Sequence, residues 1–129
     1  MTLLRLASAA MKNAHVPYSN FRVGAAIKSS NNKYYFGCNV ENAAYPQGLC
    51  AEAGALSSMV ANGCTVISEV LVVSGGEQLI VPCGGCRQKL LEFSNLETIV
   101  FLADKLGIQQ KMALTELLPC SFDNSYLNR

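Results

Sequence analysis

The amino-acid sequence predicts an α/β domain in which helices cover a largely apolar sheet. Residues 66–74 and 98–103 are mainly apolar and rich in β-branched side chains, which is typical of central strands buried on both faces. Segments whose apolar residues recur at helical spacing alternate with these runs. The chain of 129 residues suits one compact domain, so we expect residues 1–129 to form a single unit.

The first half of the chain predicts a helix, a two-stranded hairpin and a second helix, over residues 2–14, 21–29, 33–38 and 50–61. Apolar residues recur at helical spacing over the first of these segments, and Pro17 in the following loop excludes a longer helix. The Asn31-Asn32 pair suits the hairpin turn, and Asn62-Gly63 suits the end of the second helix.

The second half predicts three strands and two short helices, over residues 66–74, 83–93, 98–103, 108–114 and 115–118. Gly75 and Gly76 end the first of these strands, and Pro82 precedes the next helix. The alternation of strands and helices, without repeats or linkers, supports a layered α/β arrangement.

Composition narrows the classes of function. Half of the residues are hydrophobic, 15% are charged, and the formal net charge is +1. A disordered chain would combine low hydrophobicity with high net charge, and a nucleic-acid-binding protein would carry a basic excess. No apolar run reaches the roughly 18–20 residues of a membrane span, so we expect no membrane partner. The apolar surplus predicts burial against further copies of the chain.

Six cysteines are present. An even number can indicate a disulfide framework, but the residues after Met1 lack the pattern of a secretory signal peptide. We therefore expect a cytoplasmic protein, in which grouped cysteines are more often metal ligands or catalytic groups. Cys38, Cys64 and Cys120 have no paired spacing, and we expect them to be small buried hydrophobic residues.

Two motifs place the other three cysteines at the starts of predicted helices: Cys50-Ala51-Glu52 and Pro82-Cys83-Gly84-Gly85-Cys86. The thiolates of Cys50, Cys83 and Cys86 can fill three corners of a tetrahedral zinc site and leave the fourth for water. Helix N-termini stabilise thiolates through free N–H groups and the positive end of the helix dipole. Zinc lowers the pKa of water toward about 7, and Glu52 lies beside the metal, where it can move protons.

Together the motifs match the three-cysteine form of the zinc deaminase signature. A purely structural zinc site would need a fourth protein ligand, for which the three remaining cysteines are candidates by type only. A redox pair at Cys83 and Cys86 would leave Cys50 and Glu52 unexplained.

Over nearly its whole length the chain resembles the homotetrameric cytidine deaminases. The resemblance rests on segments 17–26 and 37–45, the two cysteine motifs, Arg87-Gln88 after them, and segment 116–119. It implies a three-layer α/β/α sandwich with a five-stranded mixed sheet and one zinc ion per subunit. It also implies deamination of cytidine or deoxycytidine to the uridine product and ammonia in pyrimidine salvage, by a homotetramer with shared active sites.

The resemblance assigns roles to single residues. Glu52 would take a proton from the zinc-activated water and pass protons to the ring nitrogen and the leaving amine. Six residues would contact the substrate: Phe21, Asn39, Glu41, Tyr45, Ala51 and Phe122. Phe21 would pack on the pyrimidine, the Ala51 backbone would contact the base, and Asn39 and Glu41 would bind ribose hydroxyls. Tyr45 and Phe122 would approach the site of an adjoining subunit.

Residue chemistry supports part of this assignment. Asn39 and Glu41 are two residues apart, so on an extended segment their side chains point the same way and can clamp adjacent hydroxyls. The alternatives are solvated loop residues at these two positions, core packing for Phe21 and anchoring of the tail for Phe122.

One position departs from the family pattern. Family members commonly carry arginine directly after the catalytic glutamate, where it donates to the zinc thiolates, whereas this chain has Ala53. Our hypothesis is that helix N-termini, aided by Arg87, stabilise the thiolates here.

Two other functions remain open. One is deamination of another aminopyrimidine, such as a blasticidin-S-type nucleoside. The segment Asn39-Val40-Glu41-Asn42 argues against it, because this segment favours a nucleoside with free ribose hydroxyls. The other is a non-catalytic zinc-stabilised interaction domain, against which the intact Glu52 argues.

Overall fold

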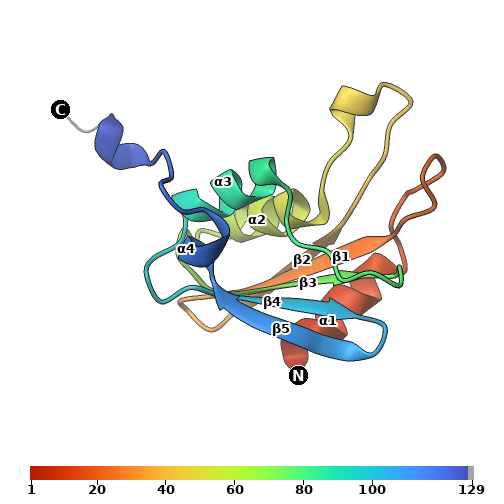
Figure 1. The fold of residues 1–129 in the computed structure, drawn as a ribbon, viewed down its shortest axis with the longest axis horizontal. Coiled ribbons are helices and arrows are strands. Elements are labelled where there is room, and N and C mark those ends of the chain that lie inside the picture. The colour runs from red at the N-terminus through yellow and green to blue at the C-terminus, as the bar shows by residue number, and fades with distance from the viewer. Residues whose placement is uncertain (128–129) are drawn as a thin grey trace.

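A computed structural model, which describes residues 1–127, contains one sheet of five strands in the order β2-β1-β3-β4-β5 (Figure 1). Their bounds are Val23–Ser29 (β1), Tyr34–Cys38 (β2), Ile67–Ser74 (β3), Ile99–Asp104 (β4) and Gly107–Ala113 (β5). β3 and β4 are parallel, and the other neighbouring strands are antiparallel. The predicted five-stranded mixed sheet is therefore confirmed.

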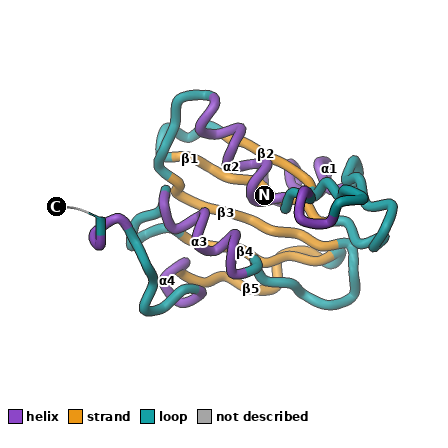
Figure 2. The backbone as a smooth tube through the Cα atoms, turned by 90° about the horizontal axis from the view of Figure 1, so that it is seen from above, coloured by secondary structure: helices purple, strands orange, loops and turns teal. Residues whose placement is uncertain are grey.

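Helices cover both faces of this sheet, as the prediction of a three-layer sandwich requires (Figures 1 and 2). The helices are α1 (Thr2–Met11), α2 (Ala51–Ala61), α3 (Gly84–Glu92) and α4 (Leu114–Leu117), with 3₁₀ turns at Tyr45–Gln47 and Asn124–Tyr126. α1 lies on one face, and the other three helices lie on the opposite face. Between residues 1 and 127, no helix combines the length and apolar character needed to cross a membrane.

The position of strand β3 in the sheet explains why its side chains are mainly apolar on both faces. Val70 and Val72 belong to the core beneath α2 and α3, while Leu71 and Val73 belong to the core beneath α1. Successive side chains of a strand point to opposite faces, so both sets are buried at once. The predicted central position of this strand is thus correct.

Two predicted ends are wrong by a few residues. α1 stops at Met11 and not at Ala14, and the Arg22 guanidinium donates to the carbonyl oxygens of Lys12 and Ala14 beyond its end, at 3.0 and 2.6 Å. Strand β1 begins at Val23 and not at 21. Arg22 and its neighbours Phe21 and Val23 are thus engaged by residues distant in the sequence, through hydrogen bonds that helical or strand periodicity does not encode.

The three cysteines outside the paired motifs differ in burial. Cys64 is buried as expected, and Cys38 is only partly buried. Cys120 is exposed, so the expectation of burial is wrong there. It lies in the irregular segment after α4 with a positive φ of 52°, where the chain has left the packed layers.

Candidate metal centre and adjoining cleft

Three cysteine sulfurs meet where helices α2 and α3 begin. Cys50 is the N-cap of α2, Cys83 is the N-cap of α3, and Cys86 lies in the first turn of α3. Their Sγ atoms all lie within 4.8 Å of one another. Three thiolates at this spacing fit a tetrahedral zinc ion with one open position, because the donor type and number match such a site.

The surroundings of the three thiols differ. Burial raises the pKa of Cys50 and, more strongly, that of Cys86, where the negative charge of Glu52 adds to the effect. A hydrogen bond from the Cys86 backbone N–H lowers the pKa of Cys83. A bound divalent cation would favour the thiolate forms of all three, because binding releases their protons.

Glu52 lies in the first turn of α2, two residues after the Cys50 ligand position. Its side chain is only 5% exposed, and burial raises its pKa. A buried carboxylate with a raised pKa beside a metal position is suited to accept and return a proton.

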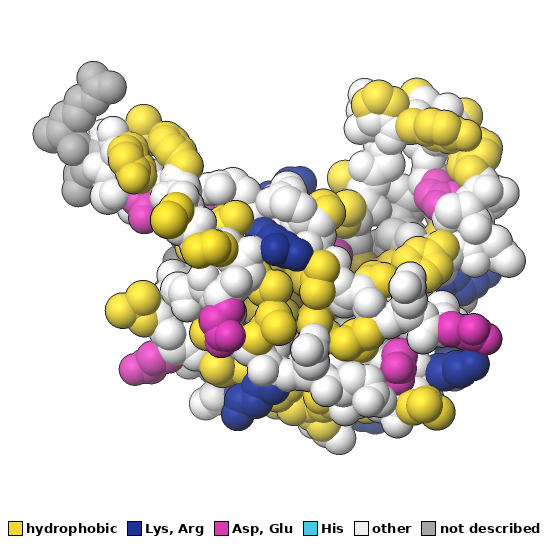
Figure 3. All heavy atoms as spheres, in the orientation of Figure 1, with side chains coloured by type: hydrophobic (Ala, Val, Ile, Leu, Met, Phe, Trp, Pro, Cys, Tyr) yellow, Lys and Arg dark blue, Asp and Glu magenta, His cyan; other side chains and the backbone are white. Residues whose placement is uncertain are grey.

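Cys50 and Cys83 open onto a cleft of about 370 Å³, and Cys86 is buried behind them. The predicted site residues that line it are Asn39, Glu41, Tyr45, Cys50, Ala51, Glu52 and Cys83. Ile80 and Val81, from the segment that leads into α3, supply part of an apolar wall. A space-filling view shows hydrophobic side chains gathered on two projections either side of a hollow over the helices (Figure 3). The cleft can therefore hold a small ligand that is partly apolar and carries a few polar groups.

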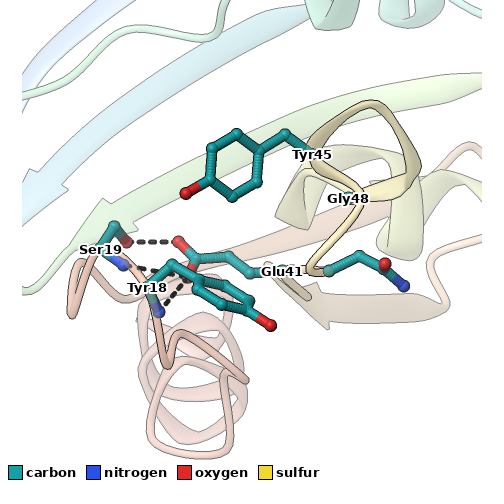
Figure 4. Close-up of a pocket in the computed structure, with 6 residues that line it drawn as sticks. Tyr18, Ser19, Glu41, Tyr45 and Gly48 are labelled. Atoms are coloured by element: carbon teal, nitrogen blue, oxygen red, sulfur yellow. Dashed lines mark hydrogen bonds between the residues drawn. The ribbon is translucent and has the colours of Figure 1, made fainter.

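Asn39 and Glu41 are both bound to protein groups at one edge of the cleft. The Asn39 amide accepts from Val23 N at 2.9 Å and donates to Phe21 O at 2.9 Å. The Glu41 carboxylate accepts from Tyr18 N at 3.0 Å, from Ser19 N at 3.1 Å and from the Ser19 hydroxyl (Figure 4). The Ser19 hydroxyl hydrogen bond is the main cause that lowers the pKa of Glu41.

Tyr18 and Ser19 are site residues that sequence reasoning missed. With Glu41, Asn42, Tyr45 and Gly48 they line a second hollow of about 410 Å³ next to the cleft. The Tyr18 and Tyr45 rings meet edge to face, with centroids 5.9 Å apart, so the two loops contact one another (Figure 4). The sequence offers one indication of these contacts, which is the polar pair Tyr18-Ser19 in the loop between Pro17 and Phe21.

Two predicted aromatic contacts lie outside the cleft of their own chain. Phe21 packs on Gly76, where an added Cβ would lie 2.7 Å from Phe21 Cε1. Phe122 lies on the C-terminal arm, which extends beyond α3 and α4 in Figure 1, and its ring stacks on Tyr126 with centroids 5.2 Å apart. The substrate roles of both residues stay predictions.

Arg87 holds the backbone around the metal centre. Its Nε donates to Pro82 O and its Nη1 to Leu117 O, each at 2.7 Å. These bonds fix the residue before Cys83 and tie α3 to the end of α4. The hypothesis that Arg87 aids the thiolates as a direct donor stays untested, since these two nitrogens are engaged by carbonyl oxygens.

Comparisons with known proteins agree with this geometry. Residues 1–103 match the family described as the cytidine and deoxycytidylate deaminase zinc-binding region. A cytidine deaminase of Sporosarcina psychrophila is 38% identical over 119 residues, which are 92% of this chain and 88% of that protein. A cytidine deaminase of Mycoplasma genitalium is 40% identical over 116 residues, which are 89% of this chain and 88% of that protein.

Solved structures give the same result. The crystal structure of cytidine deaminase from Burkholderia pseudomallei is similar with a TM-score of 0.88 and 39% identity, covering 94% of this chain and 97% of that one. That of cytidine deaminase from Mycobacterium tuberculosis gives a TM-score of 0.81 and 35% identity, covering 94% of each chain. With its zinc-binding region and fold both matched, the chain belongs to the cytidine and deoxycytidylate deaminase family.

Proposed function

We propose that this protein is a zinc-dependent enzyme that deaminates cytidine and deoxycytidine. One water is consumed, the bond from the ring carbon to the amino nitrogen breaks, and a carbon–oxygen bond forms, giving uridine or deoxyuridine and ammonia. The observation that carries the proposal is the group of three Sγ atoms within 4.8 Å, with a buried Glu52 beside it at the floor of a cleft.

In this proposal Cys50, Cys83 and Cys86 hold zinc, which supplies a Lewis acid that makes water nucleophilic near neutral pH. Glu52 accepts one proton of that water and passes it to the ring nitrogen. It then moves a second proton, from the hydroxyl now bonded to the ring carbon, to the leaving amine. Its raised pKa suits this exchange, because a general base and acid works best when its pKa approaches the working pH. The Ala51 backbone, at the lining of the cleft, contacts the base.

Asn39 and Glu41 bind the ribose hydroxyls with the hydrogen-bond donors and acceptors that their contacts within the protein leave unused. An amide NH₂ group has two donor hydrogens, and Asn39 spends one on Phe21 O. The two carboxylate oxygens of Glu41 accept three hydrogen bonds, and a carboxylate offers about four acceptor sites. The existing bonds therefore orient both groups for a ligand.

The finer features follow the same proposal. Residues 1–129 act as one catalytic domain, the protein works in the cytoplasm in pyrimidine salvage, and four copies form a homotetramer. Phe122, 50% exposed on its arm, and Tyr45, 75% exposed on its loop, then reach the site of a neighbouring copy, while Phe21 packs on the pyrimidine. Large exposed aromatic side chains of this kind are suited to contacts between chains.

The test compares ammonia release from cytidine, deoxycytidine, a blasticidin-S-type nucleoside and single-stranded DNA by zinc-loaded protein. Release from the two free nucleosides is expected, and its absence for both would reject the proposal. Glu52→Gln keeps the size of the side chain but removes the base, so it should retain zinc and lose roughly 10²–10⁴-fold in turnover. Equal turnover in this variant would reject the catalytic role of Glu52, whereas zinc binding without turnover in either protein would favour a non-catalytic zinc-stabilised domain.

A further inference from the structure

The metal centre carries more negative charge than a zinc ion neutralises. Three thiolates and one divalent zinc ion have a net negative charge, and the Glu52 carboxylate adds to it. The residue after Glu52 is Ala53, which brings no cation, and Arg87 spends two nitrogens on carbonyl oxygens. A positive charge from another part of the chain would therefore stabilise the centre.

Lys89 brings its ammonium group to this position. An added Cβ on Gly85, which lies between Cys83 and Cys86, would be 3.8 Å from Lys89 Nζ and 4.0 Å from Cys83 Sγ. The ammonium and the Cys83 sulfur thus flank the same small volume.

The Lys89 side chain does not place its charge at the C-terminal end of the α3 dipole. Lys89 lies in the last turn of α3, where a lysine ordinarily stabilises the negative end of the helix dipole. Its Nζ instead lies next to Gly85 in the first turn, where the dipole is positive and repels a cation. A side chain on a helix runs back over the residue four positions earlier, which brings the Lys89 ammonium to the first turn of α3. There the negative charge of the thiolates and Glu52 offsets the repulsion by the dipole.

We propose that the Lys89 ammonium offsets the negative charge of the three-cysteine centre and so raises the affinity of this centre for zinc. This inference rests on the zinc site of the proposed function. It adds a positioning residue that acts by charge through space, without contact with the substrate. Because Lys89 is exposed, salt weakens its effect.

The experiment measures zinc affinity by competition with a chelator at low and at high salt. Lys89→Met should bind zinc roughly three- to tenfold more weakly at low salt, the size expected for one charge several ångströms away at a protein surface. Lys89→Arg keeps the charge and should retain the affinity. Lys33→Met, in the turn between β1 and β2, removes the same charge far along the chain and should have no effect.

Three results would overturn the inference: unchanged affinity in Lys89→Met, equal losses in Lys89→Arg and Lys89→Met, or a loss that high salt does not reduce. An equal loss in Lys33→Met would also overturn it, since net charge alone would then explain the effect. Sulfur-to-cobalt absorption in Co²⁺-loaded variants checks that three-sulfur coordination is kept. The readout is metal affinity, so a failure of nucleoside deamination would reject the proposed reaction separately.

Discussion

A single methyl group added at Gly37 should destabilise the protein, because β2 and α2 touch there through their backbones. The Cβ of Gly37→Ala would lie 2.7 Å from Ala55 N, 2.9 Å from Ala51 O and 2.9 Å from the carbonyl carbon of Gly54. All three atoms belong to the α2 backbone, so no side-chain rotation relieves the overlap. The helix must move away from the sheet, and overpacking of this kind costs about 2 kcal/mol.

The same shift reaches the metal centre. α2 begins directly after Cys50, whereas Cys83 and Cys86 belong to α3, so a displaced α2 moves one ligand relative to the other two. The midpoint of thermal unfolding should fall by about 8 °C for a loss of about 2 kcal/mol in a chain of this size. Zinc affinity should fall with it.

Gly54→Ala is the matched control on the other side of the contact. Its Cβ would lie 3.7 Å from Gly37 Cα and 3.9 Å from Cys38 O, which is ordinary packing distance. Alanine also exceeds glycine in helix propensity by up to about 1 kcal/mol, so this variant should be as stable as the parent or more so. Thermal unfolding at one fixed protein concentration, with and without zinc, compares the three proteins. An unchanged midpoint in Gly37→Ala would refute the close-approach argument.

Two further predictions concern the loop that holds Glu41 and the C-terminal arm that carries Phe122. Hydrogen bonds from Ser19 and Tyr18 lower the pKa of Glu41 below 4.5, so they stabilise the folded loop above that pH and are lost as pH falls through the lowered pKa. The NMR shifts of the Tyr18 and Ser19 amides should titrate with a midpoint below 4.5 and should not titrate in Glu41→Gln; a midpoint at 4.5 or above would contradict this. Phe122→Ala should raise the KM for cytidine, with solution mass measured in parallel, and an unchanged KM would remove Phe122 from the site.

The metal centre could be predicted from sequence because its signals are local. Cys50 and Cys83 precede segments with helical composition, and a residue just before a helix starts is placed by the helix itself. The sheet could be predicted for a similar reason, since β3 and β4 are mainly apolar and rich in β-branched residues, and their burial follows from that composition.

The edge of the cleft could not be predicted in this way. Glu41 meets residues 22 and 23 positions earlier in the chain, and Asn39 meets residues 16 and 18 positions earlier. Polar loop residues have many partners within reach in the unfolded chain, and only the packed sheet selects among them. The position of Lys89 Nζ likewise depends on how a flexible side chain runs back along α3.

Both helices at the metal centre begin on a residue that is poor at capping. Cys50 and Cys83 occupy N-cap positions and make no side-chain capping hydrogen bond, although serine or aspartate there would contribute about 1 kcal/mol to each helix. The uncapped N–H groups and the positive ends of both dipoles instead converge on the three sulfurs. A metal centre that is stabilised by the positive ends of two helix dipoles is stabilised further by each positive charge nearby. The Lys89 ammonium therefore matters most in a chain with Ala53, which carries no charge, after its buried glutamate. Each of the two helices thus lacks the stability that a side-chain cap would give it at the end where the ligands lie.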